Sequence, residues 1–501
     1  MTSKAATTAP ESWTEQGNLS AEVHETHTGV VVLIGDKAYK AKKAVTTDFL
    51  DFSTAELRER ACVHEVFLNS RLAPDSYLGV AHFKGPKHGP SEPVIVMRRY
   101  PDSRRLASLV RNGQPVEDDL VAVAEKLALF HARAVRGRSI DACATAKATL
   151  ARWQENLDEL FRHAGVVLRR ESIEEVQGLA TQFIAGRSAL FAERVTGRRI
   201  VDGHADLLAD DIFCMPGGPV LLDCLEFDDR LRYVDGIDDA TFLAMDLEFL
   251  GRKDLGEYFL EQYRRFADDT APPALTDFYI AYRAVVRANV DCVRVAQGHR
   301  DAVVDAQRHL DIALEHLRAG TVRVIVIGGG PGTGKTTLAH ALVEHLRAQV
   351  ISTDELRQQL LQSGTISGTP GVLNAGLYSA ENISAVYDAA LQRAQRYLRR
   401  GQSVVLDGTW RDARQRERVR TLAAETHVPI AEFTCSVPLE DASARIQDRP
   451  ATASDATPEI AASLAGQHDA WSEAHHINTG RPLAESVAEI RRIVGSLVLN
   501  R

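Results

Sequence analysis

The pattern of apolar and polar positions divides the 501-residue chain into three stretches with different textures. From about Asn18 to Tyr100, short β-like runs such as VVVLIGDKAYKAK and PVIVMRRY surround one helical stretch, Thr54–Arg71. From about Leu106 to Leu317, apolar residues recur every three or four positions, which predicts helices. The stretch 198–227 interrupts this pattern and predicts a loop with two short strands.

The third stretch begins near Ala319, where strand-like runs start to alternate with amphipathic helical segments. The strand candidates are VRVIVIG, QVIS, SVVLD, IAEFTCS and HHINT. This alternation predicts a parallel sheet covered by helices. We therefore expect a disordered tail at 1–17, a first domain at 18–318 and a second at 319–501.

Composition and charge narrow the class of protein. Hydrophobic residues make up 45% and charged residues 25% of the chain, as in ordinary soluble globular proteins. The net charge of −9 argues against broad binding to nucleic acid or to an acidic membrane. The sequence contains no apolar run of membrane-spanning length and no signal-peptide pattern at its start, and its six cysteines form no CxxC pair. We expect a cytoplasmic protein without a disulfide framework.

The run VIVIGGGPGTGKTT contains the most specific motif in the chain. Residues 329–336 fit G-x-x-x-x-G-K-[ST], in which backbone N–H groups surround phosphate oxygens at a helix N-terminus. A chance glycine-rich turn is the alternative, but a strand before and a helix after it favour a nucleotide-binding P-loop. The expected ATP contacts are Gly329, Gly330, Gly332, Thr333, Gly334, Lys335, Thr336 and Thr337.

Charged residues that follow the next two strands are candidates for the chemistry. Asp354 and Arg357 come after QVIS, three residues apart, where the acid could accept a proton from a hydroxyl and the arginine could hold an acceptor. Asp407 ends SVVLD, where a Walker-B acid would hold Mg²⁺ together with Thr336. The alternatives are acids that cap helices and a solvated arginine. Thr409 is a further candidate for contact with the acceptor.

Two arginines, Arg445 and Arg449, lie four residues apart ahead of ATASDATPE. They suit a lid that closes over the transferring phosphoryl group, with solvated surface arginines as the alternative. This half of the chain, about 321–497, resembles the P-loop small-molecule kinases of the gluconate-kinase and zeta-toxin type. The resemblance rests on GGPGTGKTT, STDELR, VVLDGTW and SARIQDR, and implies ATP-dependent phosphorylation of a hydroxyl, with Asp354 as base and Arg357 as substrate contact.

A second constellation lies in DGHADLLADDIF and VLLDCLEF. The spacing of His204, Asp206, Asp211 and Asp223 resembles the catalytic loop and metal-binding acid of kinase-like folds. The resemblance implies that Asp206 takes the proton of an attacking hydroxyl and that Asp211 and Asp223 bind Mg²⁺. Lys40 and Lys42 alternate along AYKAKK and so share a strand face, from which one could reach nucleotide phosphates and Glu65.

The second constellation resembles the aminoglycoside phosphotransferase and kinase-like superfamily over about 18–317. The whole chain resembles bacterial two-domain proteins in which such a domain precedes a P-loop domain. The resemblance implies a bilobal α+β kinase-like domain followed by a three-layer α/β P-loop domain. Two departures bear on activity: Ala205 and Asp211 stand where the family has glycine and asparagine, and no G-x-G-x-x-G precedes Lys40. A second active kinase, a non-catalytic sensor and a chance likeness therefore all stay open.

We expect an ATP- and Mg²⁺-dependent phosphotransferase that acts on a hydroxyl of a small sugar-like or aminoglycoside-like molecule, with a second kinase site in the first domain. The alternatives are a regulatory P-loop ATPase, a toxin-like kinase of nucleotide sugars and an antibiotic-inactivating enzyme. The acid-rich run 226–239 either faces a cationic acceptor or forms a solvated surface. The sequence indicates no nucleic-acid or membrane partner and does not determine the oligomeric state.

Overall fold

The computed structural model describes residues 21–25, 29–46, 51–84, 91–369, 375–448, 457–464 and 470–499. The expected tail at 1–17 lies outside these residues. The chain forms two compact units: unit 1 is Met1–Ala134, Asp202–Arg232 and Leu250–Ala267, and unit 2 is Val135–Val201, Tyr233–Phe249 and Asp268–Arg501. The boundary that the sequence predicts near Ala319, at the end of α12, stays a prediction.

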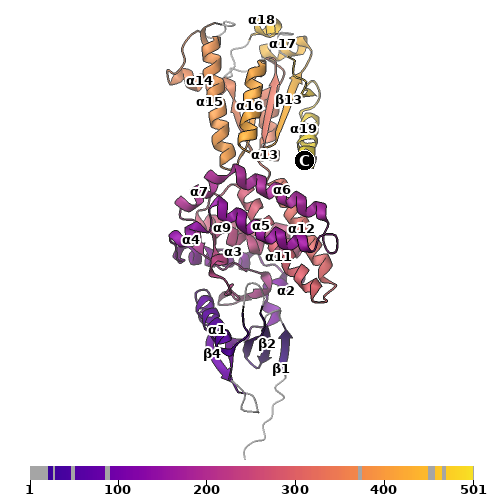
Figure 1. Ribbon diagram of the computed structural model, residues 1–501. Coiled ribbons are helices and arrows are strands. Elements are labelled where there is room, and N and C mark those ends of the chain that lie inside the picture. The colour runs from indigo at the N-terminus through magenta and orange to yellow at the C-terminus, as the bar shows by residue number, and fades with distance from the viewer. Residues whose placement is uncertain are drawn as a thin grey trace, which may run out of the picture. The chain divides into compact units, whose positions relative to one another are not determined.

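Unit 1 is built on an antiparallel sheet in the order β1-β2-β3-β5-β4. Its strands are β1 (Ala21–Glu25), β2 (Gly29–Ile34), β3 (Lys37–Lys42), β4 (Tyr77–Phe83) and β5 (Glu92–Arg98). Helix α1 (Ala55–Asn69) packs against β4 and β5 (Figure 1). It begins where the Thr54 hydroxyl accepts a hydrogen bond from the Leu57 N–H, a favourable N-cap.

The rest of unit 1 is a helical part with one hairpin. Its elements are η1 (Asp102–Arg104), α2 (Leu106–Arg111), α3 (Glu117–Arg133), η2 (Ala209–Asp211), β7 (Ile212–Met215), β8 (Gly218–Leu221), α8 (Asp229–Arg232) and α10 (Lys253–Ala267). The β7–β8 hairpin and the loops beside it occupy the break that the sequence pattern predicts at 198–227. A sheet followed by helices and this hairpin is the expected bilobal α+β arrangement, which is confirmed.

The first part of unit 2 is helical, with a short two-stranded sheet of β6 and β9. Its elements are α4 (Arg138–Ala142), α5 (Ala146–Arg162), α6 (Arg170–Gly186), α7 (Ser188–Thr196), β6 (Ile200–Asp202), β9 (Tyr233–Asp235), α9 (Gly236–Phe249), α11 (Pro273–Ala296) and α12 (Ala302–Ala319). Aromatic side chains fill its core: Trp153 and Phe183 both pack on Phe278, with ring centroids 5.3 and 4.5 Å apart.

Buried ion pairs hold part of the acid-rich run inside unit 2. The Arg194 guanidinium donates to both carboxylate oxygens of Asp235 at 2.6 Å, and Arg283 donates to Asp238 at 2.7 Å. These two acids are buried in the interior of the unit and neutralised there. The interpretation that they face a cationic acceptor is therefore wrong for Asp235 and Asp238.

The second part of unit 2 is a parallel sheet in the order β11-β12-β10-β13-β14. Its strands are β10 (Val324–Gly329), β11 (Ala348–Ser352), β12 (Ser403–Asp407), β13 (Ile430–Ser436) and β14 (His475–Asn478). All five match the strand candidates of the sequence. Strands β10 and β12 have a partner strand on each side and are covered on both faces, so residues 324–327 and 404–406 are all apolar and buried.

Helices cover both faces of this sheet, so the expected three-layer α/β fold is confirmed (Figure 1). The helices are α13 (Lys335–Leu346), α14 (Thr353–Gln362), α15 (Ala380–Arg399), α16 (Ala413–Glu425), α17 (Leu439–Asp448), α18 (Pro458–Leu464) and α19 (Leu483–Leu499), with η3 at Gly376–Tyr378. Helices α13 and α19 share one apolar core with alternate residues of β10 and β13. Helix α15 packs on β11 and β12, next to α16. Among the described residues, no helix has the length and apolar character that a membrane span requires.

A buried histidine makes the stability of unit 2 depend on pH. His316 lies 2.8 Å from both Asp277 and Glu248, one carboxylate at each ring nitrogen. Burial alone would lower its pKa, but the two hydrogen bonds raise the pKa of His316 to about 9. Because the pKa of His316 in the folded protein exceeds its ordinary value of 6.5, the charged histidine stabilises the fold. This contribution to the free energy of unfolding is complete below about pH 6.5 and is lost as the pH rises through 9.

We expect the free energy of unfolding of the wild type to fall between pH 7 and pH 10 by on the order of 2–3 kcal/mol more than that of His316→Gln. Urea titrations of both proteins at each pH would measure the difference. Parallel pH curves would contradict the assignment, because the shared lysines, cysteines and tyrosines cancel in this comparison.

Candidate functional site

The glycine-rich turn between β10 and α13 adopts the backbone of a phosphate-binding loop. Gly329 has φ = 135°, and a Cβ there would lie 2.5 Å from the Cys435 carbonyl oxygen. Gly332 has φ = 75°, and a Cβ there would lie 2.3 Å from the Ala442 carbonyl oxygen. Both conformation and close approach exclude a side chain, so these glycines are structurally required.

The polar side chains of the loop are in place for a nucleotide. The Lys335 ammonium donates to the Gly330 carbonyl at 2.9 Å, and the Thr333 hydroxyl donates to the same oxygen at 2.8 Å. Gly334, at φ = 82°, is the N-cap of α13, and the exposed Thr336 and Thr337 lie on its first turn. The loop therefore presents a cation and a helix N-terminus to one region, as phosphate binding requires.

Thr336 and Asp407 form the part of the site that could hold Mg²⁺. The Thr336 hydroxyl donates to Asp407 Oδ2 at 2.7 Å, whereas Oδ1 of this buried acid has no hydrogen-bond partner. Asp407 lies opposite Ile327 of β10 in the parallel register, which places it beside the loop. Burial raises the pKa of Asp407, and a cation would favour its charged form. A hydroxyl and an unpartnered carboxylate oxygen fit a hard cation that keeps waters and nucleotide phosphates as its other ligands.

Asp354 and Arg357 lie together at the start of α14. Arg357 Nη1 donates to Asp354 Oδ1 at 2.6 Å, its guanidinium stacks over the Tyr378 ring at 4.5 Å, and Nε has no hydrogen-bond partner. Arg357 is 6% exposed, so it is not a solvated arginine. Ser352 occupies the N-cap position, so Asp354 is not the N-cap residue. Ser352, which precedes Asp354 and Arg357, pairs with Asp407 in the sheet register. The charged groups of Asp354, Arg357 and Asp407 therefore lie at the same edge of the sheet.

Aromatic residues that the sequence did not single out line the same edge. The Tyr387 hydroxyl lies 3.4 Å from Thr409 Oγ1 and accepts a hydrogen bond from the Trp410 N–H at 3.3 Å. Tyr387 and Trp410 are buried and pack edge to face. Tyr378 lies under the Arg357 guanidinium at the same edge. No motif in the sequence marks either tyrosine.

Arg445 lies next to the P-loop. Its Nη2 donates to the Thr479 carbonyl at 3.0 Å, and its Nη1 lies 3.5 Å from where a Cβ on Gly334 would be. The Thr479 hydroxyl in turn donates to the Thr333 carbonyl at 2.5 Å, a contact between the residue after β14 and the glycine-rich loop that sequence reasoning missed. Arg449 lies outside the described residues.

A second group of charged side chains lies in unit 1. The Lys40 ammonium is 2.9 Å from Glu65 and 2.5 Å from Asp223, and the Lys42 ammonium is 2.5 Å from Glu65 and also contacts Glu226. Glu65 and Lys42 are buried. The structure thus brings both predicted lysines, the helical glutamate and the predicted metal acid together.

The acids of this group influence one another. Burial, followed by the charges of Asp223 and Asp206, raises the pKa of Asp211 well above its ordinary value. Burial would also raise the pKa of Asp223, but the Lys40 ammonium holds it below its ordinary value. His204 Nε2–H donates to the Leu222 carbonyl at 3.0 Å, which fixes the loop that carries Asp206 to the strand end before Asp223.

No group of three or more His, Cys, Asp or Glu side chains among the described residues is arranged to hold a metal ion by itself. Asp211 and Asp223 nevertheless fit a Mg²⁺ ion that takes its remaining ligands from nucleotide phosphates and water.

Ala205 has φ = 67°, in the left-handed region where glycine is favoured. Ala205→Gly would relieve about 1–2 kcal/mol of backbone strain. This gain is offset because the substitution removes a buried methyl group and gives the unfolded chain more conformational entropy. We expect its free energy of unfolding to stay within about 0.5 kcal/mol of the wild type. The equally buried Ala209, which is not in this region, provides the control: Ala209→Gly should cost about 1–2 kcal/mol. Equal losses in denaturant titrations would contradict strain at Ala205.

Comparisons with known proteins agree with this organisation. A family model described as an AAA domain matches residues 324–472. An uncharacterized protein of Mycobacterium tuberculosis, Rv2004c, is 56% identical over 477 residues, which cover 95% of this chain and 96% of the relative. The chain belongs to the family of this mycobacterial protein. The residues that the AAA-domain model matches lie in the parallel-sheet part of the chain, where the sequence predicts a P-loop domain.

Two solved structures each resemble a part of the chain. A choline/ethanolamine kinase family protein from Mesorhizobium loti has a TM-score of 0.36 and 15% identity, covering 60% of this chain and 94% of that one. A gluconokinase from Sinorhizobium meliloti has a TM-score of 0.27 and 17% identity, covering 35% of this chain and 94% of that one.

Proposed function

We propose that the P-loop part of this protein transfers the γ-phosphoryl group of ATP to a hydroxyl of a small molecule. The observation that carries the proposal is the position of Asp354 and Arg357, which follow β11 on the first turn of α14. The neighbouring strand β12 ends at Asp407, which binds the Thr336 hydroxyl at the start of α13. A P-loop that only hydrolyses ATP has no need of a buried arginine and an acid on the acceptor side.

The proposed roles follow from the chemistry of these groups. Lys335 leaves the Gly330 carbonyl and binds the β- and γ-phosphates, together with the loop amides. Asp354 accepts the proton of the acceptor hydroxyl through the carboxylate oxygen that Arg357 does not hold, while the hydroxyl oxygen attacks the γ-phosphorus and ADP leaves. Mg²⁺ held by Thr336 and Asp407 would neutralise phosphate charge.

Arg445, close to Gly334, is proposed to stabilise charge on the transferring group, with Arg449 as its predicted partner. Arg357, Thr409 and Tyr387 would contact the acceptor. The stacked guanidinium and the aromatic side chains suit a polar, sugar-like molecule that presents an anionic or hydroxyl group to Arg357. We place this reaction in the cytoplasm, where ATP is available.

A second nucleotide site in unit 1 is favoured by the Lys40–Glu65 ion pair next to Asp223 and Asp211. In such a site Lys40 would exchange Asp223 for nucleotide phosphates, and Asp206 would serve as the base. Because no glycine-rich loop precedes Lys40, a regulatory sensor that binds without turnover is the alternative. The protein would then be an ATPase or kinase controlled by its first domain.

The test is a screen of the full chain with ATP, Mg²⁺ and sugars, aminoglycosides and nucleosides, read by mass spectrometry as the gain of one phosphate. Wild type, Lys335→Ala and Asp206→Asn are compared. A product lost in Lys335→Ala assigns transfer to the P-loop site, and one lost in Asp206→Asn assigns it to unit 1. ATP hydrolysis with no phosphorylated product from any acceptor class would favour the regulatory ATPase.

A further inference from the structure

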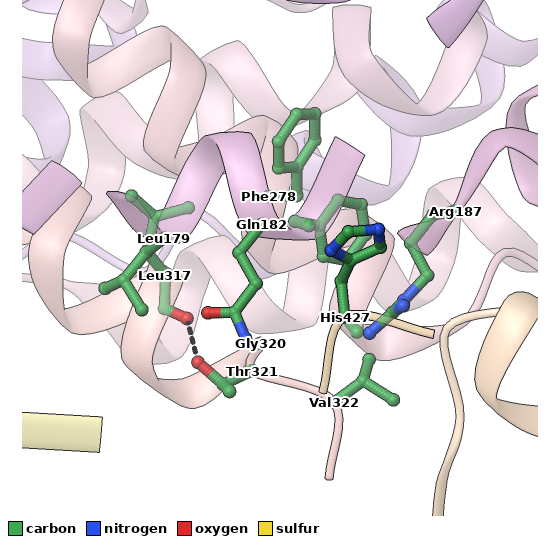
Figure 2. A pocket seen from close by; sticks show the side chains of 11 residues that line it. Leu179, Gln182, Arg187, Phe278, Leu317, Gly320, Thr321, Val322 and His427 are labelled. Atoms are coloured by element: carbon green, nitrogen blue, oxygen red, sulfur yellow. Dashed lines mark hydrogen bonds between the residues drawn. The ribbon is translucent and has the colours of Figure 1, made fainter. Parts of the chain in front are cut away.

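A small cavity lies within unit 2, away from the P-loop, where α6, α11 and the end of α12 meet the turn after α16 (Figure 2). Its volume of about 20 Å³ accommodates one water-sized occupant, since roughly 10–15 Å³ suffices for a water molecule. Its polar and aromatic lining consists of Gln182, Phe183, Arg187, Phe278, Thr321 and His427.

Arg187 is the unusual member of this lining. It is 1% exposed, and Figure 2 shows its guanidinium beside the His427 ring. Nη1 donates to the Thr426 carbonyl at 2.8 Å, but Nε has no hydrogen-bond partner. Across the part of the chain that the structure describes, no carboxylate forms an ion pair with Arg187. Its guanidinium is thus a buried cation without a counter-charge.

The surroundings compensate this charge only in part. Thr426 is the C-cap of α16, and the C-terminus of a helix carries about half a negative charge. Burial lowers the pKa of Arg187 to about 10, so the side chain stays charged at neutral pH. A buried charge without a full partner costs several kcal/mol, and a bound counter-ion would recover part of that cost.

The remaining polar groups of the cavity favour an anion. The Gln182 amide and the His427 ring can donate hydrogen bonds, while the Thr321 hydroxyl donates to the Leu317 carbonyl at 2.8 Å (Figure 2). No described residue that lines the cavity is acidic. A cation would therefore meet like charge and no carboxylate, whereas an anion would meet a guanidinium and an amide.

We propose that this cavity binds one small inorganic anion of halide size, held by Arg187 and Gln182. A cavity of about 20 Å³ suits a monatomic anion better than phosphate or sulfate, which carry five heavy atoms. Through Arg187 and Gln182, the anion would connect the helical part of unit 2 with the turn after α16. Helix α16 follows β12, the strand that ends at Asp407. Its binding is independent of the phosphoryl-transfer chemistry proposed above.

The test measures Tm of the full chain while chloride replaces methanesulfonate at constant ionic strength. For the wild type we expect a saturable rise of about 2–4 °C when chloride is roughly ten times its Kd. Arg187→Met, which keeps the length but removes the charge, should lose the rise. Arg323→Met is the matched control, because burial also lowers the pKa of Arg323 to about 10 but this residue does not line the cavity. It should keep the rise.

A second measurement covers the case in which Arg187→Met does not fold. Chloride-35 NMR line broadening by the wild type should be displaced by bromide but not by sulfate, and Gln182→Leu should weaken it severalfold. The absence of chloride-dependent stabilisation and of excess broadening in the wild type would overturn the proposal. So would equal chloride responses in Arg187→Met and Arg323→Met.

Discussion

Lys335→Ala should reduce ATP-dependent turnover at the P-loop site by at least 10²-fold, or several kcal/mol of transition-state stabilisation, without unfolding the protein. Lys335 is the first residue of α13, and among the described residues its ammonium donates a hydrogen bond only to the Gly330 carbonyl. Its loss therefore removes charge from the phosphate site and leaves the core of β10 and α13 intact. Lys335 is also the only lysine after residue 253, so this part of the sequence offers no second ammonium.

Turnover at saturating ATP and ATP binding by calorimetry would measure this effect, with circular dichroism to confirm folding. Lys147→Ala is the matched control, because Lys147 is exposed on α5 and should leave both quantities unchanged. Normal turnover by folded Lys335→Ala would refute the assignment of the phosphate site.

Asp354→Asn should lower phosphoryl transfer by roughly 10²–10⁴-fold, because the amide keeps the shape and one hydrogen bond to Arg357 but cannot accept a proton. ATP affinity should change little, since Lys335, Thr336 and the loop amides remain. Acceptor-free ATP hydrolysis should also change little, which separates a kinase from a switch ATPase.

The experiment measures transfer to an identified acceptor, hydrolysis without acceptor and ATP binding in parallel. Glu355→Gln provides the control, because Glu355 is the exposed neighbour on the same helix turn and should transfer at the wild-type rate. If Asp354→Asn transfers as fast as Glu355→Gln, Asp354 only orients Arg357, and the base must be sought near Asp407 and Thr409.

Features that depend only on residues close together in the sequence could be predicted from the local pattern. A P-loop depends on consecutive glycines and on a strand and helix that flank it, so Gly329–Thr336 could be identified from eight residues. The strands of the parallel sheet could be recognised because short strand-like runs alternate with amphipathic helical segments, most clearly at β10, where residues 324–327 are all apolar and buried. Asp354 and Asp407 could be placed on one edge, because parallel strands end at the same side of a sheet.

Contacts between distant residues could not be predicted in this way. Asp235 and Asp238 are buried against Arg194 and Arg283, respectively. Nothing in the run 226–239 indicates this, because the local sequence around an aspartate does not show whether a distant arginine will pair with it. Likewise, the sequence shows that Lys40 and Lys42 share a face, but only the fold brings Asp223, 183 residues from Lys40, against that face.

The sequence by itself therefore determined the P-loop, the parallel sheet and the candidate acids, since these follow from short-range geometry and from the periodicity of burial. The tertiary structure decided which charges are neutralised and which polar atoms lack a hydrogen-bond partner among the described residues, such as Asp407 Oδ1, Arg357 Nε and Arg187 Nε. The physical reason is that the free energy of a charged group depends on its distance from other charges and from water, and folding alone fixes those distances.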